Sequence, residues 1–481
     1  MSEIKRKTVL GILWETIGRF ASLFIQLGIT IIIARILTPA DYGTIGLLTV
    51  FVAVADIIVD SGFSTALIQK EEITDTETST VFFLNLIIGF ILYLLLCMGS
   101  PFIAEFYGIP ELQQIANILF LIIPINSLGL IQNVIIRKKL LFKISSVANI
   151  LSSLLSGVIG IILAYSGFGI TALVFQQLSM ATFRTLLYIV LCRWRPHFVF
   201  SLSCVKTFFA YSMNLMCNSL IHTIMSNIYT LVIGKYFSAS QVGYYNQAKR
   251  FEVCSSSTLT TVVVNVSFPV LAGLKDDIQR TREAYKKIMC MTSFMVMPLM
   301  ILLIAVARPF IVSLLTDKWV SAVPYLQILC VYGLLLPIVQ ISHNIYKLYL
   351  KSGQLLIIEV IKHITFVLSM IFTIKYGISV LLWGQVLVIA VVSMLHMHFS
   401  GKLLGFSVFD QIKNIAPPLI ISGMCGILLA YIPTHQSDVV TLCSHTAIFI
   451  VGYILLCLLF RVPALVEFAA ILKSHLLHRN D

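Results

Sequence analysis

Charged residues are scarce in this sequence. Asp, Glu, Lys and Arg make up only 11% of the 481 residues, against roughly one-quarter in soluble domains. Hydrophobic residues make up 58%, and the mean hydropathy is +0.97. The composition therefore excludes a soluble globular protein and indicates a chain that crosses a membrane many times.

Motifs for metals, cofactors and nucleotides are also missing. The ten cysteines are scattered without a CxxC pair or a Cys/His cluster, so we expect them to pack as small apolar residues. His396 and His398 are two residues apart, which puts them on different helical faces. No metal site and no cofactor are expected. The sequence also lacks a P-loop, the motif that binds the phosphates of ATP. Any activity that needs energy must therefore use an ion gradient, the membrane potential or the substrate's own gradient, unless a partner hydrolyses ATP.

No segment between the apolar runs is long enough to form a soluble domain. A membrane glycan polymerase or glycosyltransferase usually needs such a segment to hold its acceptor, so the protein is not expected to be an enzyme. The N-terminal apolar run resembles a secretion signal, but Glu15 and Arg19 interrupt it and no small-residue cleavage site follows. We therefore expect an uncleaved first helix.

Apolar runs recur along the whole chain. A helix crosses the hydrocarbon core with about 20 residues, and fourteen runs are long enough. They are 10–34, 43–68, 80–102, 114–136, 146–165, 169–192, 207–234, 243–272, 288–312, 323–347, 355–375, 378–399, 415–433 and 440–460. The predicted fold is an all-α integral membrane protein with about fourteen transmembrane helices.

The basic residues test this count independently, because cytoplasmic loops accumulate positive charge. With a cytoplasmic N-terminus, 24 of the 33 Lys and Arg residues fall in cytoplasmic segments. Only five fall in outer loops, namely Arg35, Lys235, Arg308, Lys318 and Lys375. This bias predicts an even number of helices with both termini inside. The net charge of +12 then comes mostly from the basic residues of the cytoplasmic loops, so it does not indicate that the protein binds nucleic acid.

Two stretches of the sequence occur twice, about 200 residues apart. Residues 34–43 (ARILTPADYG) are echoed by 234–243 (GKYFSASQVG), and 169–177 (GITALVFQQ) by 377–385 (GISVLLWGQ). Six predicted helices separate the copies, and an even number gives both the same orientation. Parallel repeats of this kind are typical of transporters.

The repeat predicts how the chain is divided. Helices 1–6 form an N-lobe in 1–200, helices 7–12 form a C-lobe in 201–402, and 403–481 holds helices 13–14 with a cytoplasmic tail. Pro39 and Gly43 are expected to shape an interhelical turn, since Pro cannot continue a helix and Gly admits unusual dihedral angles.

Five short stretches of the sequence carry a resemblance to a known family. They are 34–43, 61–70 (SGFSTALIQK), 79–85 (STVFFLN), 101–107 (PFIAEFY) and 243–250 (GYYNQAKR). On these stretches the chain resembles the polysaccharide-exporter branch, with its Wzx flippases of the colanic-acid type. The wider superfamily also contains multidrug exporters and lipid-linked oligosaccharide flippases. The resemblance covers nearly the full chain.

The resemblance implies a flippase of the bacterial cytoplasmic (inner) membrane. It would move undecaprenyl-diphosphate-linked oligosaccharide repeat units by alternating access, for O-antigen, capsule or exopolysaccharide. Expected partners are that glycan, the lipid bilayer, and the polymerase and chain-length regulator of the same pathway; a monomer is expected. The nearest alternative is a multidrug antiporter of the same superfamily, which would favour acidic residues and apolar walls.

Basic side chains inside the spans are candidates for substrate binding. A charge at membrane depth costs about 2.5–3.5 kcal/mol on insertion scales unless it meets a polar cavity or a partner. The candidates are Arg19, Arg184, Lys249 and Arg250. A diphosphate or sugar acid is bound by Arg with a two-donor fork and by Lys as a point charge. Alternatively, Arg19 snorkels to the interface and Lys249 and Arg250 cap their helix.

Asp56 and Asp60 are spaced i, i+4 on one face of the second helix. They either carry protons for ion coupling or form a salt bridge with a basic neighbour, for which Arg19 lies at a similar depth. The salt bridge is the favoured interpretation.

Polar side chains also line one face of the seventh helix. Asn214, Asn218 and His222 follow an i, i+4, i+8 pattern. This stripe either binds sugar hydroxyls or packs against another helix. In the eleventh helix, Glu359 could pair with Lys362 or His363, although snorkelling to the interface is favoured there.

Overall fold

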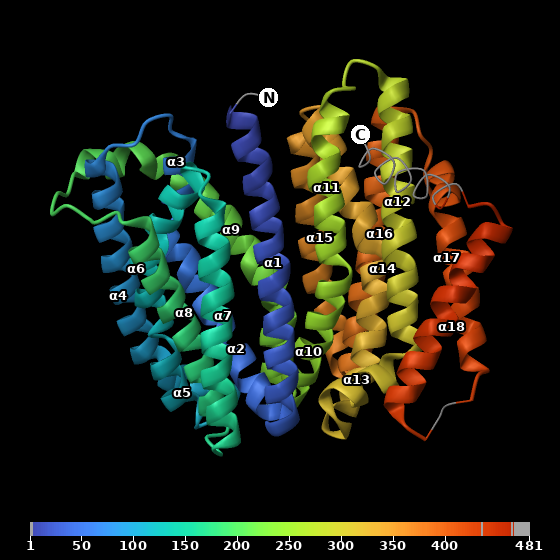
Figure 1. Cartoon of the computed structure of the whole chain (residues 1–481), viewed down its shortest axis with the longest axis horizontal. Coiled ribbons are helices and arrows are strands. Elements are labelled where there is room, and N and C mark those ends of the chain that lie inside the picture. The colour runs from blue at the N-terminus through green and yellow to red at the C-terminus, as the bar shows by residue number, and fades with distance from the viewer. Residues whose placement is uncertain (1–2, 434–435, 463–464, 466–481) are drawn as a thin grey trace. The chain divides into compact units, whose positions relative to one another are not determined.

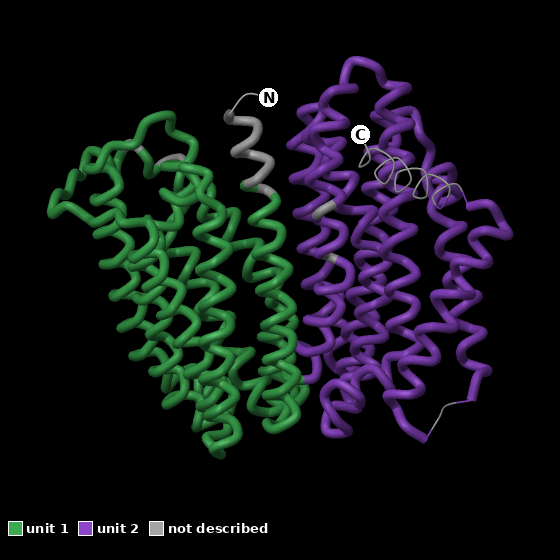
Figure 2. Tube along the Cα trace, viewed as in Figure 1, with its two compact units in different colours: residues 1–243 green, residues 244–481 purple. Residues whose placement is uncertain are grey.

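The computed structural model describes residues 3–433, 436–462 and 465. Those residues form helices, turns and loops, with no strand among them (Figure 1). Fourteen helical stretches of this described part are long and apolar enough to span a membrane, which confirms the predicted count and the all-α class. Lys473 and Arg479, which contributed to the predicted orientation, lie outside the described residues. The chain divides into two compact units, Met1–Gly243 and Tyr244–Asp481 (Figure 2).

Unit 1 is a bundle of long helices. It contains α1 (Glu3–Ile36), α2 (Pro39–Asp60), α3 (Phe63–Gln69), α4 (Asp75–Tyr107), α5 (Leu112–Leu119), α6 (Ile122–Lys138), α7 (Phe142–Tyr165), α8 (Ile170–Cys192), α9 (Leu202–Tyr236) and the start of α10 (Ala239–Ser255). α1 packs on α7, α7 on α8, α6 on α4 and α8, and α2 on α6 and α9. The seventh span, α9, therefore packs within unit 1. The repeat boundary at residue 200, which rests on sequence similarity, stays a prediction.

Unit 2 holds the rest of α10 and the remaining helices. They are α11 (Ser257–Ala272), α12 (Ile278–Ala305), α13 (Ala307–Leu315), η1 (Asp317–Ala322), α14 (Val323–Leu348), α15 (Ser352–Thr373), η2 (Ile374–Tyr376), α16 (Ile378–Leu404), α17 (Val408–Ala430) and α18 (Asp438–Leu459). α14 packs on α11, α12 and α16, and α15 packs on α16. The last pair attaches through α17 on α12 and α18 on α13.

Four predicted spans are not continuous helices: 114–136, 243–272 and 288–312 are interrupted at 120–121, 256 and 306, and 43–68 is interrupted more sharply. α2 ends at Asp60, and Ser61 and Gly62 take left-handed backbone conformations with φ of 46° and 74° before α3 begins. A Cβ on Gly62 would lie 2.6 Å from the carbonyl oxygen of Ser212, so α9 passes directly against this turn. Hydropathy could not reveal the break, because the residues after it are as apolar as those before it.

The turn before α2 is set by its sequence. Thr38 Oγ1 accepts the backbone N–H of Asp41 at 3.3 Å, and the Asp41 carboxylate accepts the backbone N–H of Thr38 at 2.9 Å. This capping box satisfies two N–H groups at the start of the helix, and Pro39 occupies its first position. In the second copy, Ser238 Oγ accepts the N–H of Gln241 at 3.4 Å, so the cap is partly repeated.

The duplication is also visible in the backbone. Gly169 and Gly377, which are equivalent in the sequence repeat, directly precede α8 and α16 with φ of 55° and 97°. Leu140 and Leu350 each lie two residues after the end of α6 and α14, both with φ of 55°. Non-glycine residues rarely adopt positive φ, so its recurrence at matching sites supports a true structural repeat.

Gly43 has a different role from the one predicted. It lies one turn inside α2 rather than in the loop, and a Cβ there would be 1.7 Å from the carbonyl oxygen of Ala239. Reciprocally, a Cβ on Gly243 would be 1.9 Å from the carbonyl oxygen of Pro39. Positions 39 and 43 of one copy thus meet positions 243 and 239 of the other, and both glycines are needed for close backbone approach.

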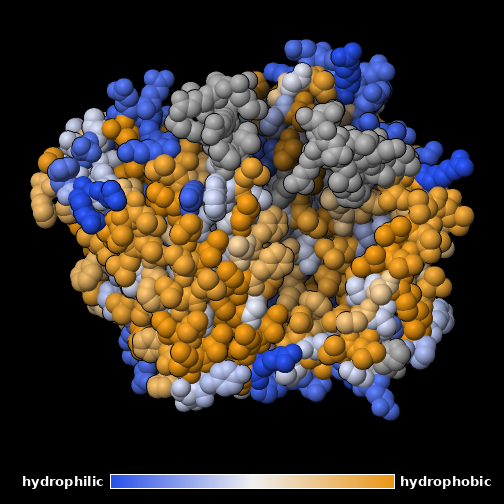
Figure 3. All heavy atoms as spheres, viewed as in Figure 1, coloured by the Kyte–Doolittle hydropathy of each residue, from blue (hydrophilic) through white to orange (hydrophobic). Residues whose placement is uncertain are grey.

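The outer surfaces of the helices are apolar. Figure 3 shows hydrophobic side chains along the middle of the helices in view and hydrophilic ones near their ends. Exposed examples are Phe90, Leu94, Met98, Ile371 and Phe372. Such a continuous exposed apolar surface fits hydrocarbon, not water.

We predict that Gly43→Ala destabilises unit 1. The new methyl group must displace backbone, which costs about 1–3 kcal/mol or more. Gly28→Ala in α1 is the matched control, because nothing lies within 4 Å of its added Cβ. Thermal unfolding of the purified protein in detergent measures both. Equal melting temperatures for the two variants would contradict the close contact.

Candidate functional site: a polar cavity in unit 1

A chain of hydrogen bonds joins three helices inside unit 1. Asn126 on α6 donates through Nδ2 to both carboxylate oxygens of Asp56 on α2, at 3.3 and 3.1 Å. Arg184 on α8 donates through Nη2 to Oδ1 of Asn126 at 2.9 Å. The amide therefore links a carboxylate to a guanidinium.

The orientation of the Asn126 amide follows from its neighbours. A carboxylate accepts hydrogen bonds and a guanidinium only donates them, so the NH₂ group must face Asp56 and the oxygen must face Arg184. The opposite charges of Asp56 and Arg184 also attract each other directly. The three residues together lower the cost of holding two charges among apolar helices.

Close packing of α6 and α8 holds these side chains in place. Thr185 Oγ1 donates to the carbonyl oxygen of Ile125 at 3.1 Å. A Cβ on Gly129 would lie 3.0 Å from Thr185 Oγ1, so glycine is what allows the helices to approach. Asn126 directly follows Ile125, and Arg184 directly precedes Thr185. The hydrogen bond between Ile125 and Thr185 therefore restricts the backbone positions of both residues.

The hydrogen-bonded chain lines a cavity of about 310 Å³. Further polar lining comes from Asn133, Arg137 and Asn149, and Arg137 Nε donates to Asn133 Oδ1 at 3.3 Å. This volume is at the lower end of that of small-molecule sites, about 300–1,000 Å³. The cavity can therefore hold one charged or hydroxyl-rich group, not a whole oligosaccharide.

The predicted Asp pair is divided between two environments. Asp56 lines the cavity, whereas Asp60 accepts a hydrogen bond from the hydroxyl of Ser64 across the turn that follows α2. The basic neighbour of Asp56 is Arg184, not Arg19. Arg19 is exposed on α1, which packs on α7.

Other predicted residues lie outside this cavity. Asn214, Asn218 and His222 are all exposed on α9, as one face of a helix requires. Lys249 and Arg250 are half-buried on α10 in unit 2, where Lys249 Nζ lies 5.7 Å from the centre of the Tyr245 ring. Their roles in substrate binding stay predictions.

The residues Asn126, Asn133, Arg137 and Asn149, which line the cavity beside Asp56 and Arg184, are not among the predicted site residues. Asn126, Asn133 and Arg137 are spaced i, i+7, i+11 and so share a face of α6. Arg137 is one of the 24 basic residues that the sequence places in cytoplasmic segments. The shared helical face of these three α6 residues is the signal in the sequence that indicates this set, as it does for Asn214, Asn218 and His222 in the seventh span.

A charged cavity inside a bundle of apolar helices, within a duplicated fold, is typical of membrane carriers. More specifically, the chain belongs to the polysaccharide biosynthesis protein family, whose model matches residues 32–324. The predicted resemblance to polysaccharide exporters is thus confirmed, and the chain is a multi-pass membrane protein.

Similar proteins include two curated relatives and one solved structure. The chain is 26% identical to the teichuronic acid biosynthesis protein TuaB of Bacillus subtilis over 89% of each chain. It is 27% identical to the lipopolysaccharide biosynthesis protein WzxC of Escherichia coli, over 69% of this chain and 68% of WzxC. The lipid II flippase MurJ, in an inward closed conformation, is 19% identical with a TM-score of 0.73, over 94% of this chain and 99% of MurJ. That last likeness shows the fold.

We predict that Asn126→Ala destabilises the protein by about 1–3 kcal/mol, because it removes the donors to a largely buried carboxylate. Asn227→Ala is the control, since the Asn227 amide donates to the Thr223 carbonyl of its own helix at 2.9 Å. Chemical unfolding of unit 1 in mild detergent compares the two variants. An unchanged stability of the Asn126 variant would contradict the role of the hydrogen-bonded chain.

Proposed function

We propose that the protein is a flippase for an undecaprenyl-diphosphate-linked oligosaccharide repeat unit in the bacterial inner membrane, serving surface polysaccharide synthesis. The observation that carries this proposal is the cavity of unit 1, where Arg137 and Arg184 stand beside three amide side chains. Membership of the polysaccharide biosynthesis family supports it. The similar structure of MurJ, a lipid II flippase, is consistent with the same class of cargo.

The cavity suits an anionic, hydroxyl-rich head group. Arg184 has five N–H donors, and its hydrogen bond to Asn126 uses one of them. Other donors could engage a diphosphate oxygen or a sugar carboxylate with the geometry that favours Arg. Asn133 and Asn149 offer both donors and acceptors to sugar hydroxyls, whereas lipid chains offer neither.

Transport rather than catalysis is the activity that we propose. The head group would cross between two lobes that open alternately to each side, while the polyprenyl tail stays in lipid. Lys249, Arg250 and the stripe of Asn214, Asn218 and His222 would contribute further contacts from the second repeat. The cytoplasmic location of both termini belongs to this proposal and rests on the basic residues of the loops.

The function is tested by deleting the gene and analysing the membrane lipids. We expect undecaprenyl-linked repeat units to accumulate in the inner leaflet and surface polysaccharide to disappear. Normal surface polysaccharide combined with altered drug sensitivity would overturn the proposal in favour of a multidrug antiporter. Surface polysaccharide must reappear when the wild-type gene is restored.

We predict that Arg184→Ala lowers polysaccharide export at least about tenfold, equivalent to about 1.4 kcal/mol of lost interaction with the anion. Arg184→Lys should retain part of the activity, because a point charge replaces the two-donor fork. Export is measured per molecule of folded protein in the deletion strain. Arg195→Ala is the control, since Arg195 is exposed beyond the end of α8. Full export by Arg184→Ala would exclude Arg184 from substrate binding.

We also predict that Arg250→Ala lowers export, because it removes a cation placed within the predicted eighth span. The measurement is the same, and protein level in the membrane must be matched to wild type. Full export at normal protein level would remove Arg250 from the proposed binding set.

A further inference from the structure

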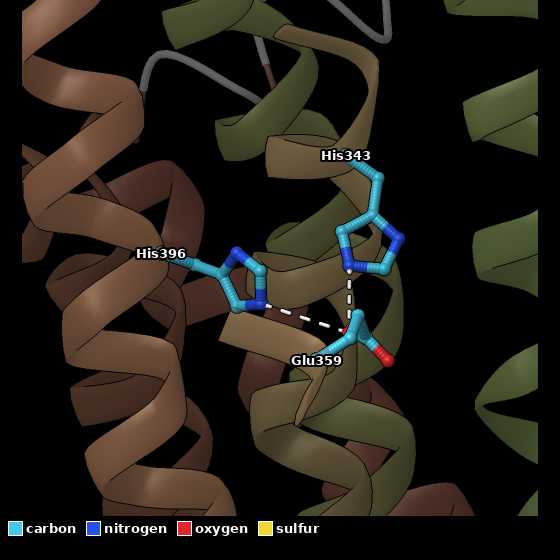
Figure 4. A group of neighbouring side chains, drawn as sticks. All are labelled: His343, Glu359 and His396. Atoms are coloured by element: carbon cyan, nitrogen blue, oxygen red, sulfur yellow. Dashed lines mark ion pairs between the residues drawn. The ribbon is translucent and has the colours of Figure 1, made fainter. Parts of the chain in front are cut away.

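Three helices of unit 2 bring a carboxylate and two imidazoles together. His343 lies on α14, Glu359 on α15 and His396 on α16, and their side chains converge (Figure 4). His343 Nε2 is 3.4 Å from Glu359 Oε1, and His396 Nε2 is 4.0 Å from the same oxygen. One carboxylate oxygen thus faces two ring nitrogens from two other helices.

The two oxygens of Glu359 have different neighbours. Oε2 accepts a hydrogen bond from Lys362 Nζ and lies 3.8 Å from His363 Nε2. The pairing along α15, which the sequence favours less than snorkelling, is therefore present. Oε1 is buried and has no hydrogen-bond partner among the described residues. Lys362 therefore orients the carboxylate and leaves Oε1 directed at the imidazoles.

His396 carries the strongest signal of a missing partner. Its side chain is 0% exposed, and within the described part of the chain neither ring nitrogen has a hydrogen-bond partner. A buried polar group without a partner costs about 1–3 kcal/mol. Such an arrangement persists where something else completes it.

We propose that His343, Glu359 and His396 form a binding site for a divalent first-row transition metal ion of the Zn²⁺ class. Their three ligand atoms all lie within 4.8 Å of one another. Around Zn²⁺, with ligand distances of about 2.0–2.1 Å, neighbouring ligand atoms are about 3.3 Å apart. The 3.4 Å between His343 Nε2 and Glu359 Oε1 already matches, and His396 needs to move by about 1.5 Å at most.

The donor set favours this class of metal. Imidazole nitrogens suit Zn²⁺, Cu²⁺, Ni²⁺ and iron, whereas Mg²⁺ and Ca²⁺ prefer oxygen ligands. Two histidines and one carboxylate leave a coordination position for water or another ligand. The side chains of His343 and Glu359 are 27% and 24% exposed, whereas His343 Nε2 and Glu359 Oε1 are buried, so a bound ion would be enclosed. The Lys362 ammonium group reduces the affinity of the site for the ion, because it competes for the carboxylate of Glu359.

The position of the site gives the ion a structural effect. His343, Glu359 and His396 lie five, seven and eight residues from Leu348, Ser352 and Leu404, where α14 ends, α15 begins and α16 ends. The site is therefore about 7–12 Å inside one end of unit 2. A bound metal would connect three helices there and favour one arrangement of them.

Metal binding is tested on the full-length protein purified in detergent and stripped with a chelator. Cobalt(II), whose absorption reports tetrahedral nitrogen and oxygen ligands, is titrated first, and bound zinc is then counted after gel filtration. We expect about one ion per chain and a higher melting temperature with the ion present. His343→Gln, Glu359→Gln and His396→Gln should each weaken binding at least about tenfold, since even second-shell changes cost 10–100-fold.

Two variants separate this site from non-specific binding. His398→Gln, which alters an exposed histidine two residues away on α16, should bind like wild type. Lys362→Met should bind more tightly, because it removes the competing cation. The partly exposed position of His343 provides a variant that folds even if His396→Gln does not. The proposal is overturned if folded wild type binds neither ion, if Na⁺ in excess displaces both, or if His343→Gln binds unchanged.

Discussion

The hydrocarbon of a bilayer offers no hydrogen bond, and every polar group within it must find a partner inside the protein. Asp56 meets this requirement through Asn126, which in turn meets Arg184. The requirement explains why Asp56, Asn126 and Arg184, which come from three helices, meet in one set. It also makes each set informative about function, because a costly arrangement is retained only where stability or activity depends on it.

Close helix packing is the means by which these sets form. Without a hydrophobic force between helices in lipid, association depends on small residues that let backbones approach. Gly129 brings α6 against α8 beside the polar cavity, and Gly62 brings α9 against the turn that follows α2. Gly43 and Gly243 do the same for the two repeated turns. Gly43 and Gly243, which look like loop residues in the sequence, are therefore sites of contact.

The sequence was sufficient for those features that depend on one helix at a time. Hydropathy located fourteen spans because span length is imposed by the bilayer, and the echoes at Gly169 and Gly377 located a repeat that the backbone also has. Contacts between helices could not be predicted in the same way. Asp56 and Asn126 are 70 residues apart, and no spacing rule joins them. His396 was dismissed as a ligand because only its own helix was considered, whereas its neighbours His343 and Glu359 come from α14 and α15.

The two polar sets use equivalent parts of the duplicated fold for different chemistry. Asn126 and Arg184 lie in the fourth and sixth spans, and His343 and His396 lie in the tenth and twelfth, which correspond to them in a six-helix repeat. The carboxylates come from non-equivalent helices, the second span for Asp56 and the eleventh for Glu359. The glycines before α8 and α16 are shared, as are the positive-φ residues after α6 and α14. The two repeats therefore share the backbone conformations that build them. Their polar groups differ, forming a cationic cavity in one repeat and an imidazole–carboxylate cluster in the other. Such divergence is expected if the two repeats bind different ions or groups.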